Sequence, residues 1–202
     1  MALEGVSHGP AAYSPGKGTI LLALAGKGDA GGTPLVTLRD GAALRALTVY
    51  HPEQRQENPP LAYPWAVRAE GIGCALENVL LVNPYQGVDL ASRPSGRHSV
   101  HGLYGQPLYR GLAIDRSLDV GRIANVHFWP FWDEWRSPLE AFMKENAVAF
   151  VVGRADWEYF SNCFCIGYRI GFHFLETADG SANALLTPVS YTHLTLPTKR
   201  IV

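Results

Sequence analysis

Apolar and polar residues alternate along most of the chain, and three segments repeat the alternation in the same order. The segments are 76–90, 100–114 and 160–174. Each begins with an apolar residue, has a glycine eleven positions later, and places apolar residues at positions twelve and fourteen. An apolar period of two predicts β-strands, whereas helices repeat their apolar residues about every 3.6 positions.

Two further segments begin with the same pattern, so the repeat starts fall at residues 44, 76, 100, 123 and 160. The middle starts are 24 and 23 residues apart, and the outer intervals of 32 and 37 residues hold insertions. A period in the low twenties with glycine corners is typical of solenoids, and the signature of leucine-rich repeats is missing. The sequence therefore predicts an all-β fold, a right-handed parallel β-helix with strands stacked about 4.8 Å apart.

The repeat also predicts where individual side chains point. Because alternate side chains of a strand face opposite sides, positions twelve and fourteen should face inward and the residue between them outward. The inward set is Val88, Leu90, Leu112, Ile114, Phe172 and Phe174, and the outward set is Asp89, Ala113 and His173.

The second residue after several repeat starts is asparagine. Asn78, Asn125 and Asn162 occupy this position, with Gly102 as the exception. Asparagine tolerates left-handed backbone angles, and its amide can bond to an equivalent amide above. We expect an asparagine ladder with a structural role at a turn.

One segment, from about residue 129 to 147, interrupts the repeat. Within it, Ser137–Asn146 predicts a helix, with Ser137 as N-cap and Pro138 at the first helical position. The rest of the segment is expected to leave the coil and to flank a groove.

Composition narrows the class of protein. The 202 residues are 47% hydrophobic and 17% charged, with 21 glycines, 14 prolines and a net charge of −1. This excludes a disordered chain, a coiled coil and a basic nucleic-acid binder. No apolar run approaches the ~18 residues of a membrane span. The three cysteines cannot form a disulfide framework and are expected in the core.

The two ends of the chain differ from its middle. Val189–Thr198 resembles a translated sequencing adapter, so residues 189–202 are expected to be a non-native tail. We expect residues 1–188 to be a partial β-helix domain that is truncated at both ends. No signal peptide is visible in this stretch.

Four motifs resemble a known family: Asn83–Asp89, Gly96–His98, Leu103–Gly111 and Asp119–Trp132. They are similar to bacterial pectin-lyase-like β-helix proteins of the rhamnogalacturonase/epimerase type, related to family-28 glycosidases and pectate lyases. The resemblance covers roughly residues 3 to 180. It implies an extracellular or periplasmic protein whose partner is a pectin-like, uronate-containing polysaccharide. No cofactor is expected, except calcium if the protein is a lyase.

Catalysis in such proteins needs carboxylates or a base with an arginine. A glycosidase uses two carboxyl groups, and Asp89 and Asp115 are expected on neighbouring coils, less than ~10 Å apart. A lyase needs a base and a positive charge near the substrate carboxylate, for which Arg110 is a candidate. The alternative is that the acids are turn residues or partners of arginines.

Substrate binding is assigned to aromatic and basic residues. Tryptophans offer flat apolar faces suited to sugar rings, and the alternative is a hydrophobic cap over the coil. His98 and His101 should face opposite sides of a strand, so no metal site is predicted. The candidates for substrate binding are Trp129, Trp132, Trp135, Arg97, His98, Arg116 and His127.

Three functions stay open at this point. The leading hypothesis is cleavage or modification of an extracellular polysaccharide. The second is a non-catalytic module that binds a glycan, and the third is a structural stretch of a larger enzyme. A groove beside the 129–147 insertion without exposed acids or an arginine–acid cluster would count against the first. No membrane or nucleic-acid partner is expected, and the sequence does not indicate an oligomeric state.

Overall fold

The protein is built almost entirely of β-strands. The computed structural model describes residues 2–4, 18–133, 136–190 and 194–195. Strands account for 53% of the chain and helix for 5%. The predicted all-β class is confirmed. No helix in these residues is long and apolar enough to cross a membrane.

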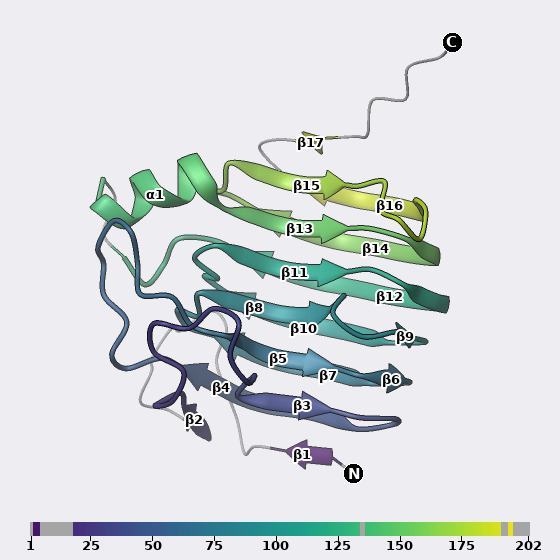
Figure 1. The fold of residues 1–202 in the computed structure, drawn as a ribbon, viewed down its shortest axis with the longest axis horizontal. Helices are drawn as coiled ribbons and strands as arrows, with labels where there is room; N and C mark the ends of the chain where they lie inside the picture. The colour runs from purple at the N-terminus through teal and green to yellow at the C-terminus, as the bar shows by residue number, and fades with distance from the viewer. Residues whose placement is uncertain (1, 5–17, 134–135, 191–193, 196–202) are drawn as a thin grey trace.

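One large sheet of ten strands forms one wall of the molecule (Figure 1). Its main path is parallel throughout and runs through β1 (Ala2–Glu4), β4 (Ala43–Tyr50), β7 (Ala75–Leu81), β10 (Ser99–Gly105), β12 (Ser117–Phe128), β14 (Ala155–Cys165) and β16 (Ala182–Ser190). Three short strands join beside this path: β2 (Ile20–Leu22), β6 (Gly71–Ile72) and β9 (Ser95–Gly96).

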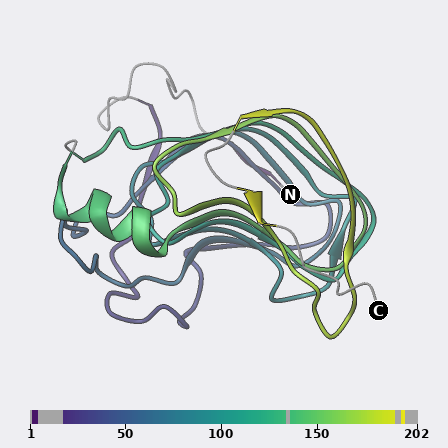
Figure 2. The same ribbon diagram turned by 90° about the horizontal axis from the view of Figure 1, so that it is seen from above.

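A second sheet of seven parallel strands forms the opposite wall. It consists of β3 (Val36–Leu38), β5 (Trp65–Ala69), β8 (Gln86–Leu90), β11 (Arg110–Ile114), β13 (Val148–Val152), β15 (Ile170–Phe174) and β17 (Leu194–Thr195). The chain visits the two sheets in turn, and we call one strand of each sheet a tier. Seen from above, successive tiers superimpose as a flattened ring (Figure 2).

The register of the large sheet follows the repeat. Leu44 pairs with Leu76, Leu76 with Val100, Val100 with Ile123, and Ile123 with Phe160. All five residues are buried. The five predicted repeat starts are therefore confirmed as one column of the core. The column also continues to Leu186, which the sequence comparison missed.

Five of the six predicted inward residues of the second sheet are buried, and Phe174 is half-buried. Val88, Leu112, Phe150 and Phe172 pair in one buried column. Phe150 and Phe172 stack with ring centroids 4.3 Å apart. Each such side chain contributes about 1.5–3 kcal/mol by leaving water. Of the predicted outward residues, His173 is half-buried, whereas Ala113 and Asp89 are buried, Asp89 fully.

The asparagine column has the expected backbone conformation. Asn78, Asn125 and Asn162 have φ of 52°, 54° and 50°, and Gly102 has 69°. The column lies inside the long strands and bends them, so its expected position at a turn was wrong. Asn162 Nδ2 donates to Asn125 Oδ1 at 2.6 Å. A Cβ at residue 102 would lie 2.6 Å from Asn78 Oδ1, which explains the glycine.

The predicted helix is confirmed as α1 (Pro138–Asn146). The Ser137 hydroxyl accepts a hydrogen bond from Glu140 N at 3.0 Å, as an N-cap should. Its residues Leu139 and Met143 are buried. The helix lies outside the ring of strands, at one end (Figure 2).

The three cysteines are free and buried, as expected of core residues. Burial raises the pKa of Cys163 to about 11 and that of Cys165 to about 12. Both thiols are therefore protonated at neutral pH and unreactive as nucleophiles.

Candidate functional site

Asp89 caps a turn. Its Oδ2 accepts a hydrogen bond from Arg68 Nε at 2.7 Å, within an ion pair. Its Oδ1 accepts the backbone N–H groups of Ala91 and Ser92 at 2.9 and 2.8 Å. Because both oxygens are occupied and the side chain is fully buried, Asp89 cannot face a substrate. The turn after β8 explains its presence.

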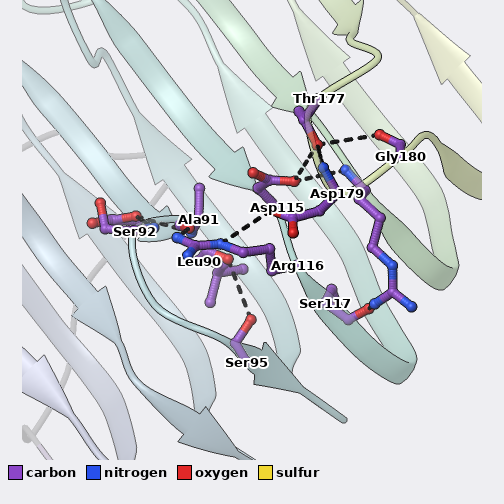
Figure 3. Close-up of polar contacts among 12 residues, drawn as sticks. Leu90, Ala91, Ser92, Ser95, Asp115, Arg116, Ser117, Thr177, Asp179 and Gly180 are labelled. Atoms are coloured by element: carbon purple, nitrogen blue, oxygen red, sulfur yellow. Dashed lines mark hydrogen bonds and ion pairs between the residues drawn. The ribbon is translucent and has the colours of Figure 1, made fainter.

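Asp115 likewise holds a turn, in the next tier. Its Oδ1 accepts Arg154 N at 2.8 Å and the Thr177 hydroxyl at 3.3 Å (Figure 3). Gly153 leaves room for it, since a Cβ there would lie 2.5 Å from Asp115 Oδ1. Asp89 and Asp115 share no hydrogen-bond partner among the described residues, and each holds a turn of its own. The two acids lie on neighbouring tiers, as expected, since Asp115 N donates to Leu90 O at 3.3 Å, but the buried Asp89 has both oxygens occupied.

The three candidate arginines lie in two places, Arg110 beside α1 and Arg97 and Arg116 where β9 lies. Arg110 packs on Tyr109, with its guanidinium carbon 3.8 Å from the ring centroid, and donates to the carbonyl of Asn146 at 3.2 Å. Burial lowers its pKa from the usual value. It therefore ties the end of α1 to the tier below. Arg116 instead donates to Ala91 O at 2.7 Å on the side of the stack where β9 lies.

Arg97 belongs to a network of charges at that same corner. It pairs with Asp119 at 2.6 Å, and the backbone N–H of Asp119 donates to Asp156 Oδ2 at 2.9 Å. Asp156 pairs in turn with Arg154. Each of these carboxylates has a partner, which fits the alternative that the acids serve turns and arginines.

His98 is not on the surface. Its side chain is 1% exposed, and its Nε2 lies 3.0 Å from Glu158 Oε1. Gly121 lies between the two residues in the stack. It pairs with Glu158 of the next tier, and the neighbouring Arg122 N donates to His98 O of the tier before. His98 therefore points into the core and cannot bind a polysaccharide.

The candidate aromatic residues divide into two groups. Trp129 lies against His127, with ring centroids 4.5 Å apart, and against Phe131 at 4.6 Å. Trp132 packs on the core, and its backbone N–H donates to Gln106 Oε1 at 2.8 Å. Trp135 lies outside the described residues. The aromatic segment is thus part surface and part cap.

Gln106 was missed by sequence reasoning, although it organises this segment. Its side chain is buried and also accepts Phe131 N at 2.9 Å. Its amide donates to Asp133 Oδ1 at 2.5 Å. Asp133 accepts the Ser137 hydroxyl as well, at 2.7 Å. The cap before α1 is therefore anchored to the end of β10, and Asp133 is occupied.

A groove runs across the outer face of the large sheet beside Trp129. Tyr104, His127 and Phe164 pair in register across β10, β12 and β14. With Asn125, Asn162 and Val126 they line a space of about 310 Å³. We call this the aromatic groove. His127 and Phe164 meet edge to face at 4.4 Å.

The aromatic groove is uncharged. Burial lowers the pKa of His127 from 6.5, so the imidazole is neutral at pH 7 and offers one donor and one acceptor. Asn125 and Asn162 add amides that are themselves linked. Sequence reasoning assigned His127 to binding but missed Tyr104 and Phe164. The signal was present, since all three residues stand four positions after a repeat start.

The described residues contain no group of three or more histidine, cysteine, aspartate or glutamate side chains that could hold a metal ion. Comparison of the chain with models of protein families, with curated proteins and with solved structures found no match.

Proposed function

We propose that this chain is a right-handed parallel β-helix whose aromatic groove binds an uncharged glycan. The observation that carries the proposal is the column Tyr104–His127–Phe164, which sets three rings in register on three tiers. The function is binding; cleavage is the alternative.

The β-helix rests on the order of the strands. Each tier stacks on the previous one with parallel pairing in both walls, and the repeat starts form one buried column. Parallel strands of one sheet that are joined by a crossover connect in the right-handed sense in about 98% of cases. This favours the right-handed form.

The chemistry of the groove favours sugars. Aromatic rings present flat apolar faces to the C–H faces of a pyranose, and amides and a neutral imidazole pair with its hydroxyls. Tiers are about 4.8 Å apart, so a chain that crosses all three would lie along the axis of the stack. Trp129 extends the apolar surface past His127.

The groove favours neutral sugars over uronates. None of the residues that line it carries a charge at pH 7. The arginines expected to bind uronate carboxylates are engaged elsewhere, Arg97 with Asp119 and Arg116 with Ala91 O. We therefore propose a neutral extracellular polysaccharide, or a neutral stretch of a pectin-like one, as the partner.

Cleavage lacks a carboxylate pair among the described residues beside the groove. In the neighbouring insertion, Asp133 holds Gln106 and Ser137, and Glu140 pairs with Lys144. Asp89 and Asp115 cap turns. No acid is among the described residues that line the groove, so none of them could protonate the leaving group of a glycosidic bond.

Affinity electrophoresis in gels containing neutral and acidic polysaccharides tests the proposal. Phe164→Ala and Tyr104→Ala should weaken retardation about fivefold each, since a stacking contact contributes about 1 kcal/mol. Trp157→Ala is the matched control, because Trp157 is an exposed aromatic residue of the same sheet outside the groove. Equal loss in the control, or release of reducing ends by the unmodified protein, would overturn the proposal.

A further inference from the structure

A second cavity lies at the other end of the stack, against the second sheet. It has a volume of about 200 Å³ and lies between the loops that follow β2 and β4. Trp65, Pro34 and Pro64 give it apolar walls, and His51 is its one ionisable residue. A liquid water occupies about 30 Å³, so the cavity has room for a ligand the size of one sugar ring.

His51 is held in place by its backbone. Asn83 Oδ1 accepts His51 N at 3.0 Å, and Asn83 Nδ2 donates to His51 O at 3.1 Å. The ring packs edge to face on Tyr63 at 4.9 Å. Nδ1 of the ring is buried without a hydrogen-bond partner among the described residues, and the residue as a whole is 2% exposed.

An unpartnered buried imidazole is costly. Burial lowers the pKa of His51 to about 4, so it is neutral at pH 7 and has one donor and one acceptor to offer. A buried polar atom without a partner costs about 1–3 kcal/mol. The buried hydroxyl of Tyr63 beside it is also unpartnered. A ligand hydroxyl, which both donates and accepts, would satisfy the imidazole.

A polar basin adjoins this cavity. It has a volume of about 380 Å³ and shares Thr33 and Pro34 with the cavity. Arg39, Arg68 and Glu70 line it. The ion pair between Arg68 Nε and the buried Asp89 holds the Arg68 side chain in place. The Arg39 and Glu70 side chains have no ion-pair or hydrogen-bond partner in the part of the chain that the structure describes.

The charges of the basin balance. Two arginines face it, Glu70 opposes them, and the buried Asp89 neutralises Arg68. An acidic ligand would gain from Arg39 and lose against Glu70. Guanidinium and carboxylate groups together suit vicinal hydroxyls, which accept from the one and donate to the other.

We propose that the cavity and the basin form one binding site for a neutral sugar. The ring packs on Trp65, one hydroxyl pairs with His51, and the neighbouring hydroxyls pair with Arg39 and Glu70. This site lies against the second sheet, whereas the aromatic groove lies on the large sheet, so the proposal does not rest on the groove.

The test uses the full chain and a panel of methyl glycosides of glucose, galactose, mannose, xylose, arabinose and rhamnose, with galacturonic acid as the charged comparison. The imidazole nitrogen resonances of His51 are followed by NMR, and affinities are measured by calorimetry. At least one neutral glycoside should shift the His51 resonances and bind at least tenfold more tightly than galacturonic acid.

Variants separate binding from structure. His51→Phe should abolish binding while the melting temperature stays equal or rises, because the change removes a buried polar atom that has no partner among the described residues. Arg39→Gln should weaken binding about tenfold, as expected for a hydrogen bond to a charged group. Arg169→Gln, an exposed arginine at the far end of the stack, is the matched control. Phe164→Ala, in the aromatic groove, should leave this binding unchanged.

Three results would overturn the proposal. If no glycoside of the panel shifts the His51 resonances at high millimolar concentration, the cavity holds water only. Tighter binding of galacturonic acid would contradict the neutral ligand class. Unchanged affinity in Arg39→Gln would remove the basin from the site.

Discussion

The two ends of each tier bury their side chains in different ways. Where the large-sheet strands end, beside α1, Phe128 lies on Phe150 at 5.4 Å, and Phe150 lies on Phe172 at 4.3 Å. Where the strands begin, the interior holds His98 and Glu158 instead. One end is thus stabilised by apolar contact and the other contains buried polar groups.

The polar end is only partly satisfied. His98 Nδ1, Glu158 Oε2 and Ser117 Oγ are buried without a hydrogen-bond partner among the described residues. Gly121 makes the His98–Glu158 contact possible, because a Cβ there would lie 2.5 Å from His98 Nε2 and 2.3 Å from Glu158 Oε2. Since each unpartnered atom costs about 1–3 kcal/mol, this end adds little net stability.

The difference shows that one side of the stack can supply stability while the other side depends on the register of the tiers. The His98–Glu158 pair spans three tiers and requires a glycine between its members. Both members and the glycine must therefore be in register for the contact to form.

The largest expected effect is at the apolar end. Phe150→Ala should lower the free energy of unfolding by about 3–5 kcal/mol, because it opens a cavity between two stacked rings. Urea denaturation measures the loss. The exposed Trp157→Ala is the control and should change stability by less than about 0.5 kcal/mol. A loss below about 1 kcal/mol for Phe150→Ala would contradict the assignment of stability to this end.

A smaller effect is expected at the polar end. Glu158→Ala should cost about 2–3 kcal/mol, because it leaves the buried His98 Nε2 without its partner. The cost should fall when His98 is replaced by leucine in the same protein, which a double-mutant cycle measures. Glu176→Ala, at an exposed glutamate, is the control. Additive losses from the two single variants would show that the pair is not coupled.

A third measurement uses pH on the unpaired histidine. His51 has a pKa of about 4 in the folded chain against 6.5 in the unfolded chain, so the unfolded state binds more protons between these values. The contribution of His51 to the free energy of unfolding is complete above pH 6.5 and is lost progressively as the pH decreases toward 4. The loss attributable to His51 should be about 2 kcal/mol by pH 5.

His51→Phe should remove this part of the pH dependence, and His101→Phe, at an exposed histidine, is the matched control. A slope between pH 6.5 and 4 that is the same in His51→Phe as in the unmodified chain would contradict the assignment to His51. This comparison also separates the unpaired His51 from the paired His98.

The sequence by itself determined which residues of successive strands pair with one another in this protein. The repeat starts, the left-handed column at Asn78, Asn125 and Asn162, and the capped helix at Ser137 all follow from spacing and local propensity. They could be predicted because each depends on neighbours in the chain or on the same position in the next repeat. The same register also aligns Tyr104, His127 and Phe164, although that alignment was not recognised as a site.

Tertiary structure alone decided what the polar residues do. Alternation placed Asp89 on the outer side, but only folding brings Arg68 over it. His98 points inward because the left-handed Arg97, with φ of 50°, reverses the alternation just before it. Partners of buried polar groups come from other tiers, tens of residues away, and side-chain spacing carries no record of them. Local pattern therefore fixed the stack, and contacts between tiers fixed its chemistry.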